Sequence, residues 1–358
     1  MATLSVPGRV ELAGNHTDHQ QGRVLGSAIH LNVQASYSAN SDSVINIQSK
    51  GYSPIQFKTS QLSVRPAEFG KPVALARGVA AAFQDLGLRI GGFDAELTNT
   101  LPIGAGLSSS AAFSVLVARI FSRLYNNGSV EDIVIARTAH RAETEHFGKP
   151  SGLTSQLVCA LGHTVYVDLK TNEIERIQAD FSEMGLTMCL TDTGGSHDGL
   201  NTSYARIPAD MRYIANLFDV GVLADVDPAA FRERGWDQSN RPVRRAMHFF
   251  DENARVPLMR DALKAHNGQE YMRLMNESGR SSETLLNNIV TSSTGDTRLQ
   301  EGLERSAALL DGKGAWRVHG GGFAGCVQAL MPSDFFPTYC AEMEKSFGAG
   351  KCFRVRLV

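Results

Sequence analysis

The stretch LPIGAGLSSSAAF, residues 101–113, decides what kind of fold to expect from this chain. Gly104 and Gly106 let the backbone turn tightly and approach a ligand without a clash from a Cβ atom. The serines lead into a helical run, and a helix N-terminus binds phosphate through its free N–H groups and its positive dipole end. The stretch therefore predicts a phosphate-binding loop. The alternative is an ordinary Gly/Ser loop with a serine helix cap, and the pattern matches neither a Walker A motif nor a dinucleotide fingerprint.

The elements expected around this loop are of mixed type. Up to about residue 195, strand-like alternation mixes with helical spacing, and from there on helices dominate until the chain returns to strands. We expect strands at 30–39, 43–49, 163–171, 187–194, 315–320, 326–331 and 352–358, and helices at 73–87, 130–148, 203–221, 227–235, 242–265, 269–286 and 298–310. Residues 93–125 should form a strand, the glycine- and serine-rich loop and then a long helix. The pattern predicts an α+β protein whose two halves meet somewhere in residues 170–195.

The composition indicates a folded protein without a general attraction to nucleic acid or membranes. Of 358 residues, 42% are hydrophobic and 20% are charged, which suits a sizeable core. A formal net charge of −2 gives no pull toward anionic partners. Five widely spaced cysteines without a Cys-x-x-Cys pair favour free thiols in a reducing compartment. Without a signal peptide pattern or a run of about 18 apolar residues, we expect a soluble, cytoplasmic protein.

A second glycine-bounded segment, VPGRVELAGNHTDHQQG at 6–22, concentrates polar side chains. Its arginine, glutamate, aspartate and two histidines offer the convergent donors and acceptors that a sugar needs. The alternative is a metal site, since His16 and His19 are three residues apart with Asp18 between them. Zinc takes three or four ligands, however, and no other His or Cys pair in the sequence has ligand spacing.

A third stretch, VHGGGFAGCVQAL at 318–330, places three consecutive glycines between two strand-like runs. Consecutive glycines cost chain entropy. They predict a turn whose backbone approaches another group closely. A plain tight turn, the alternative, would need fewer glycines.

In order, spacing and content, these stretches resemble the GHMP small-molecule kinases, and within them the galactokinases. The similar segments are PGRVELAGNHTDHQQGRVL (7–25, the galactokinase signature), PIGAGLSSSAA (102–112, the phosphate loop), AETEHFGKPSGLTSQ (142–156), NESGRSS (276–282) and HGGGFAGC (319–326, the motif that supports the phosphate loop). The resemblance covers about residues 5–330. It implies an α+β fold of two domains, at 1–180 and 181–358, with the active site in the cleft between them.

The resemblance also implies ATP and Mg²⁺ as cofactors and assigns roles by position. Arg9 would stabilise the transferred phosphoryl group, and Ser110 and Glu143 would hold Mg²⁺; Glu143 could otherwise be a surface residue of a charged helix face. The residues that would cradle the triphosphate are Gly104, Ala105, Gly106, Leu107, Ser108, Ser109, Ser110 and Ala111. The residues that would line the sugar pocket are Asn15, His16, Asp18, Gly152 and Tyr204.

Three positions depart from the galactokinase pattern. Galactokinases have Met-Asp-Gln where this chain, in what we expect to be an uncharged loop, has Thr154, Ser155 and Gln156; that aspartate is the presumed base. Serine is no base near neutral pH and brings no charge to pair with Arg9, so Ser155 is a catalytic-site residue of altered chemistry. Asn15 replaces a glutamate that contacts the sugar in the family, and His19 stands where tyrosine is common.

These departures leave three hypotheses open. In the first, the protein is a kinase of a different substrate, such as a sugar acid whose anion Ser155 and Asn15 accept; phosphoryl transfer through a loose transition state needs little from a base. In the second, it is a catalytically impaired homologue that senses a sugar or nucleotide. In the third, it is an ordinary galactokinase in which water or another acid accepts the proton, the candidates being Asp18, Asp192 and Asp198.

The function that these observations favour is an ATP-dependent sugar kinase, which transfers the γ-phosphoryl group to the anomeric hydroxyl of galactose or of a related sugar or sugar acid. Its partners would be the sugar and ATP, without nucleic acid or membrane. The sequence does not determine the oligomeric state; the family is often monomeric.

Overall fold

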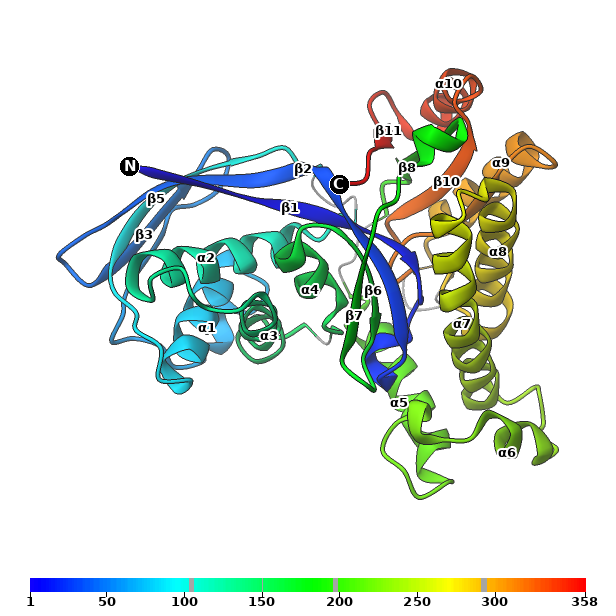
Figure 1. Cartoon of the computed structure of the whole chain (residues 1–358), viewed down its shortest axis with the longest axis horizontal. Helices are drawn as coiled ribbons and strands as arrows, with labels where there is room; N and C mark the ends of the chain where they lie inside the picture. The colour runs from blue at the N-terminus through cyan, green and yellow to red at the C-terminus, as the bar shows by residue number, and fades with distance from the viewer. Residues whose placement is uncertain (103–105, 150, 196–198, 291–294) are drawn as a thin grey trace. The chain divides into compact units, whose positions relative to one another are not determined.

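The computed structural model describes residues 1–102, 106–149, 151–195, 199–290 and 295–358. The chain forms two compact units, which are unit 1 (Met1–Arg9, Ala28–Ile103, Leu107–His163) and unit 2 (Val10–Ser27, Gly104–Gly106, Thr164–Val358). The chain therefore passes between the units several times, whereas the domains predicted at 1–180 and 181–358 are continuous; that division and the cleft stay predictions. Both units combine helices with strands, so the predicted α+β class is confirmed (Figure 1).

Unit 1 contains a mixed sheet. The long strands β1 (Ala2–Ala13) and β2 (Arg23–Ala39) run through both units. In unit 1, β2 pairs antiparallel with β5 (Phe93–Asn99), which pairs in parallel with β3 (Val44–Ser49). Strand β4 (Ile55–Lys58) continues the sheet antiparallel to β3. The parallel pair requires a crossover, and the chain between β3 and β5 supplies one that includes a helix.

Four helices pack together below these strands as drawn in Figure 1. They are α1 (Pro72–Asp85), α2 (Ser109–Tyr125), α3 (Asp132–Arg141) and α4 (Thr154–Leu161). Phe121 of α2 is fully buried and lies edge-on to Phe93 of β5, with ring centroids 5.4 Å apart, and 5.6 Å from Phe83 of α1. These aromatic contacts fix α2, and with it the end of the predicted phosphate loop, on the sheet.

Unit 2 is built on an antiparallel sheet in the order β11-β8-β10-β9, with β6 and β7 pairing beside the N-terminal part of β2. The strands are β6 (Thr164–Asp168), β7 (Glu173–Ile177), β8 (Leu186–Asp192), β9 (Ala315–Val318), β10 (Cys326–Pro332) and β11 (Cys352–Val355). The helices are α5 (Asn201–Asn216), α6 (Pro228–Glu233), α7 (Arg241–Lys264), α8 (Gly268–Ser281), α9 (Arg298–Leu310) and α10 (Phe336–Phe347). Helices α8 and α9 pack on the sheet, and α7 packs on α8.

Most predicted helices and strands are found, but several elements were missed. The helix predicted at 298–310 has these bounds in the structure, and the one at 73–87 ends where Gly87 adopts a φ of +71°. The helix predicted at 130–148 becomes α3 followed by a wider turn of π-helix, Ala142–His146. Strands β1, β4 and β7 and helices α4 and α10 were not predicted. Among the described residues, no helix is both long enough and apolar enough to cross a membrane.

Candidate active site

The start of α2 carries the described part of the predicted phosphate loop; Gly104 and Ala105 lie outside the described residues. Gly106 has a φ of +70°, a left-handed conformation that favours glycine, and a Cβ atom there would lie 3.2 Å from the ring of His319. Ser108 is also left-handed, with φ 59° and ψ 45°, and α2 begins at the next residue. The free N–H groups of a helix end thus follow directly on the glycine-rich stretch.

Strand β1 holds Arg9 against this loop. The backbone N of Arg9 donates to the carbonyl oxygen of Leu107 at 3.2 Å. Gly8 allows this approach, because a Cβ atom there would lie 2.9 Å from the same oxygen. Leu107 and Ala111 are buried, so they anchor the loop and the helix start, whereas Ser109 is exposed. A ligand would therefore meet serines and backbone N–H groups at this helix end.

Glu143, which the resemblance assigns to Mg²⁺, lies in the π-helical turn and is only 2% exposed. Its Oε1 accepts the Ser110 hydroxyl at 2.7 Å and lies 3.4 Å from the Lys149 ammonium. Its Oε2 accepts the Ser151 hydroxyl at 3.0 Å and the Gln156 amide. Burial alone would raise the pKa of Glu143, but Lys149 and these donors outweigh it and lower that pKa. Glu143 is therefore an ionised, buried carboxylate and not a surface residue.

The pair of Ser110 and Glu143 fits a magnesium ion. Mg²⁺ prefers hard oxygen ligands and is typically held by one or two carboxylates together with substrate phosphates. The Ser110 hydroxyl and Glu143 Oε1 are 2.7 Å apart, so one cation could touch both oxygens. Ser110 is also in the first turn of α2, beside the N–H groups that suit phosphate. The donor set thus matches the metal that the resemblance implies.

Ser155 lies in the first turn of α4, and the expectation of a loop there was wrong. An isolated helix of this length, eight residues, is marginal in water, and its sequence pattern is correspondingly weak. Tertiary packing supplies the stability, since α4 packs on α2 and α3 and Leu157 and Val158 are buried. Gly162, with φ +71°, ends the helix. Gly152 precedes it and is partly buried.

The side chain of Ser155 faces Arg9. The guanidinium of Arg9 donates to Ser155 Oγ through Nε at 3.1 Å and through Nη2 at 2.9 Å. The Ser108 hydroxyl donates to the same oxygen at 3.1 Å. Two N–H groups of one guanidinium are the fork that binds a carboxylate bidentately, yet here they share one neutral oxygen. The geometry therefore retains an arginine fork that suits an acidic group at position 155.

The second group of predicted site residues lies in unit 2, where Asn15 is 1% exposed. Its Nδ2 donates to Glu11 Oε1 at 3.0 Å and to the carbonyl oxygen of Gly320 at 2.6 Å. Its Oδ1 accepts from Ser282 Oγ and Asn288 Nδ2, both at 3.2 Å. Both amide hydrogens and both oxygen lone pairs are thus used within the fold. Asn15 connects the signature segment to the third glycine-rich stretch.

Glu252 of α7 anchors the signature segment and was not found from the sequence. It is fully buried, and its Oε1 accepts the backbone N–H groups of Gly14 at 3.0 Å and of Asn15 at 3.3 Å. Ser278, in the segment NESGRSS, donates to the same oxygen at 2.9 Å, and Arg255 pairs with Oε2. Burial opposes ionisation, but the neighbouring cations, Arg255 first, lower the pKa of Glu252 to about 2. The carboxylate therefore stays charged beneath the loop.

His16 and His19 bind one another. His16 Nδ1 lies 3.3 Å from His19 Nε2, and His16 Nε2 lies 3.0 Å from the carbonyl oxygen of Gly321. Since that carbonyl can only accept, His16 donates from Nε2 and accepts at Nδ1 from His19. Burial lowers the pKa of both rings, that of His19 to about 3. In the described part of the chain, no three His, Cys, Asp or Glu side chains form a group that could hold a metal.

The close approach predicted for the third glycine-rich stretch is confirmed. A Cβ atom on Gly321 would lie 2.8 Å from the ring of Tyr204, and one on Gly322 would lie 2.1 Å from the carbonyl oxygen of Asn288. The hydroxyl of Tyr204, in α5, donates to the carbonyl oxygen of Gly322 at 2.7 Å, and burial raises its pKa. Tyr204 is thus packed against the glycines.

The aspartates named as alternative proton acceptors have different settings. Asp192, at the end of β8, is paired with Lys351 at 2.5 Å, and its Oδ1 accepts the backbone N–H of Gly194 at 2.9 Å. Asp18 is partly buried and accepts the backbone N–H of His19 at 2.9 Å. Asp198 lies outside the described residues.

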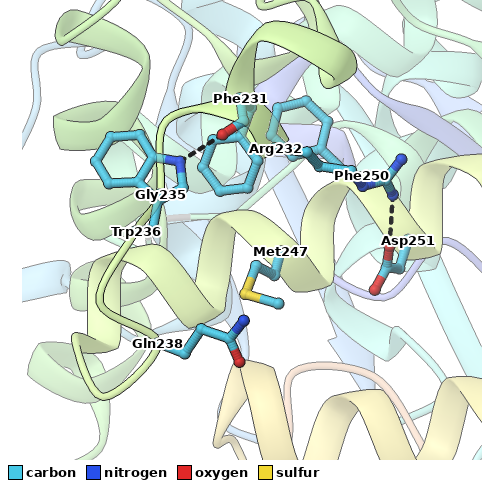
Figure 2. Close-up of a pocket in the computed structure, with 8 residues that line it drawn as sticks. All are labelled: Phe231, Arg232, Gly235, Trp236, Gln238, Met247, Phe250 and Asp251. Atoms are coloured by element: carbon cyan, nitrogen blue, oxygen red, sulfur yellow. Dashed lines mark hydrogen bonds and ion pairs between the residues drawn. The ribbon is translucent and has the colours of Figure 1, made fainter.

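A separate pocket of about 380 Å³ lies between α6 and α7. Figure 2 shows its aromatic lining, Phe231, Trp236 and Phe250, and the Arg232–Asp251 ion pair across it. The indole N–H of Trp236 donates to the carbonyl oxygen of Phe231 at 2.6 Å. None of the residues predicted for the active site lines this pocket.

Comparison with known proteins finds two family profiles that match segments of this chain and solved structures that share its fold. A profile described as the GHMP kinases N-terminal domain matches residues 74–163, and one described as the galactokinase galactose-binding signature matches residues 2–39. The galactokinase of Lactococcus lactis, solved with galactose, is 20% identical, with a TM-score of 0.87 over 99% of this chain and 93% of that one. The mevalonate kinase of Methanococcus jannaschii is 18% identical, with a TM-score of 0.70 over 100% and 98% of the two chains.

The chain has the fold of the GHMP kinases and carries their N-terminal domain, so the predicted resemblance to this superfamily is confirmed. Its N-terminal segment matches the galactokinase galactose-binding signature. The phosphomevalonate kinase of Streptococcus pneumoniae, solved with phosphomevalonate and AMPPNP, shares the fold at a TM-score of 0.67 and 13% identity, over all of both chains.

Proposed function

We propose that this protein is an ATP- and Mg²⁺-dependent sugar kinase, which transfers the γ-phosphoryl group of ATP to the anomeric hydroxyl of galactose or of a related sugar or sugar acid. The observation that carries the proposal is the cluster in unit 1 that joins the start of α2, the Ser110–Glu143 pair and Arg9. Phosphoryl transfer depends mostly on positioning and on cationic stabilisation, and these groups supply both.

The phosphate-binding half of the mechanism uses the start of α2. Its free N–H groups and the hydroxyls of Ser108 and Ser109 would hold the phosphate oxygens of ATP. Ser110 and Glu143 would hold Mg²⁺, which neutralises phosphate charge when it is bound. The donors to Oε2, Ser151 and Gln156, fix the orientation of the Glu143 carboxylate.

The reacting half depends on Arg9. Its guanidinium would stabilise the charge on the transferred phosphoryl oxygens, and its backbone bond to Leu107 keeps it beside the loop. Ser155 would orient the substrate hydroxyl but cannot remove its proton near neutral pH. A base typically contributes about 10²–10⁴-fold, so its loss slows the transfer without abolishing it.

A sugar acid is the substrate class that the surroundings of Ser155 favour. The Arg9 fork and the first turn of α4 both favour negative charge, and position 155 contributes none of its own. A carboxylate on the substrate would supply that charge. Asn15 gives this idea no support, because its amide is engaged within the fold.

The other hypotheses differ in what they require. An ordinary galactokinase would need another proton acceptor, and the Lys351 pair of Asp192 makes this carboxylate a poor candidate. A sugar or nucleotide sensor would need only binding, and the neutral Ser155 beside Arg9 is the observation that favours it.

The test is ADP release from ATP and Mg²⁺ with a panel of neutral sugars and uronic acids, combined with direct binding of ATP. Turnover with one sugar or uronic acid is expected, and the product should carry its phosphate on the anomeric oxygen. Clear ATP binding without turnover on any member of the panel would refute the kinase and favour the sensor.

A further inference from the structure

Lys149 is a charged group beside the Mg²⁺ position that the mechanism above does not use. Its ammonium lies 3.4 Å from Glu143 Oε1, while its side chain is 51% exposed. Its backbone N donates to the backbone carbonyl oxygen of Glu143 at 3.1 Å. The loop thus folds back on the carboxylate, with Gly148 at a φ of +77° in the turn. The fold therefore holds the lysine at this carboxylate through a backbone hydrogen bond as well as the ion pair.

The two oxygens of Glu143 have different partners. Oε2 accepts from two uncharged groups, Ser151 and Gln156, which orient the carboxylate. Oε1 faces the Ser110 hydroxyl and the Lys149 ammonium. The ammonium thus lies at the oxygen that, together with Ser110, makes up the fitting donor set for a divalent cation. One carboxylate oxygen with one hydroxyl beside it cannot hold both cations at close range without strong repulsion between them.

We propose that Lys149 is a built-in competitor of the divalent cation: it neutralises Glu143 when the metal is absent, leaves Oε1 when the metal binds, and so sets the metal concentration that the protein requires. This inference rests on the Mg²⁺ site of the proposed function.

The test is the affinity for Mn²⁺ of protein saturated with a non-hydrolysable ATP analogue, measured from the EPR signal of the free ion. Lys149→Gln should bind Mn²⁺ roughly two- to fivefold more tightly than the parent protein, the range expected for removing one half-exposed ion pair. Lys149→Arg keeps the charge and should stay near the parent value. A merely structural lysine would give unchanged or weaker binding on substitution.

Lys170→Gln is the matched control. Lys170 is 49% exposed and pairs with Asp225 in unit 2 at 3.0 Å, so its removal changes net charge equally at another place. It should leave the Mn²⁺ affinity unchanged; an equal gain in this variant would attribute the effect to net charge and overturn the proposal. In a Glu143→Gln background, Lys149→Gln should no longer raise the affinity.

The outcomes separate this inference from the proposed function. If the parent protein binds Mn²⁺ through Glu143 and Lys149→Gln has the same affinity, the competitor role is refuted but the metal site is not. An affinity that Glu143→Gln does not lower would refute the metal site itself, and the competitor role with it.

Discussion

Two positions where the galactokinase pattern described under Sequence analysis has acids are neutral in this chain, and their surroundings are opposite. Ser155, in unit 1, faces the Nε and Nη2 donors of Arg9. The Nδ2 of Asn15, in unit 2, faces the carboxylate of Glu11 and the carbonyl oxygen of Gly320, both of which are acceptors. A carboxylate would be stabilised by the guanidinium at position 155 and repelled by the acceptors at position 15. Replacing an acid by a neutral residue therefore has different consequences at the two positions. Position 155 could still accept a carboxylate, whereas the amide of Asn15 is part of the hydrogen-bond network of the fold.

The largest expected effect tests the anchor of the unit 2 segment. Glu252→Gln should lower the free energy of unfolding by about 3–5 kcal/mol. Arg255 would lose its buried counter-charge, and the N–H groups of Gly14 and Asn15 would lose a charged acceptor. Urea unfolding followed by circular dichroism measures this. Glu342→Gln, which breaks an exposed pair with Lys345, is the control and should change stability by less than about 1 kcal/mol. Equal losses in the two variants would contradict the anchor.

Restoring the acid at position 15 should cost somewhat less. Asn15→Glu and the isosteric Asn15→Asp should each lower the free energy of unfolding by about 2–4 kcal/mol, because the carboxylate oxygen that replaces Nδ2 would face Glu11 and the Gly320 carbonyl without a donor. Since aspartate matches asparagine in size, a loss in both variants identifies charge and not volume as the cause. If Asn15→Glu is as stable as the parent and gains galactose binding, the contrast between the two positions fails.

Restoring the acid at position 155 should change activity and leave stability nearly unaltered. In Ser155→Asp the carboxylate would pair with the Arg9 fork and serve as a base, so kcat/KM for galactose should rise about 10- to 100-fold. Activity on a uronic acid should fall, because the new charge repels the substrate's carboxylate. Steady-state ADP release on both sugars measures this, with Ser155→Asn as an uncharged control. A gain on both sugars would remove the argument for an anionic substrate.

The sequence predicted the glycine-rich stretches better than their partners. Three consecutive glycines signal a close approach, and Gly321 and Gly322 do meet Tyr204 and Asn288. No local pattern could show that Glu252 binds Gly14, because 238 residues separate them. Asn15 was expected at the substrate, since an amide within the signature segment gives no sign that its hydrogen bonds are already used.

Ser155 lies in helix α4, which the sequence pattern did not predict. The strand β1 was missed for a similar reason: Pro7 and Gly8 interrupt a run in which Val6, Val10 and Leu12 are buried. In both cases tertiary contacts outweigh weak local propensity. Helix and strand propensities could not pair Ser155 with Arg9, whereas the resemblance to galactokinases could.

The smallest effect, counted per pH unit, concerns the histidine pair of unit 2. His19 keeps a pKa of about 3 in the fold, because burial first and the neighbouring His16 second disfavour its charged form. Its pKa lies near 6.5 in the unfolded chain, so the unfolded state takes up a proton that the fold refuses. Stability should therefore fall as the pH drops from about 6.5 toward 3, by up to about 1.4 kcal/mol per pH unit for this group.

The variant His19→Gln removes this proton uptake and can still donate to His16. Its midpoint of urea unfolding should therefore fall less steeply than that of the parent between pH 6.5 and 4.5. In this range Glu252 is still ionised in the folded state of both proteins. His266→Gln is the control, because that histidine is exposed and lies beside Glu183. If His19→Gln leaves the slope of the parent unchanged, His19 must be protonated in the fold. That outcome would contradict the neutral His16–His19 hydrogen bond.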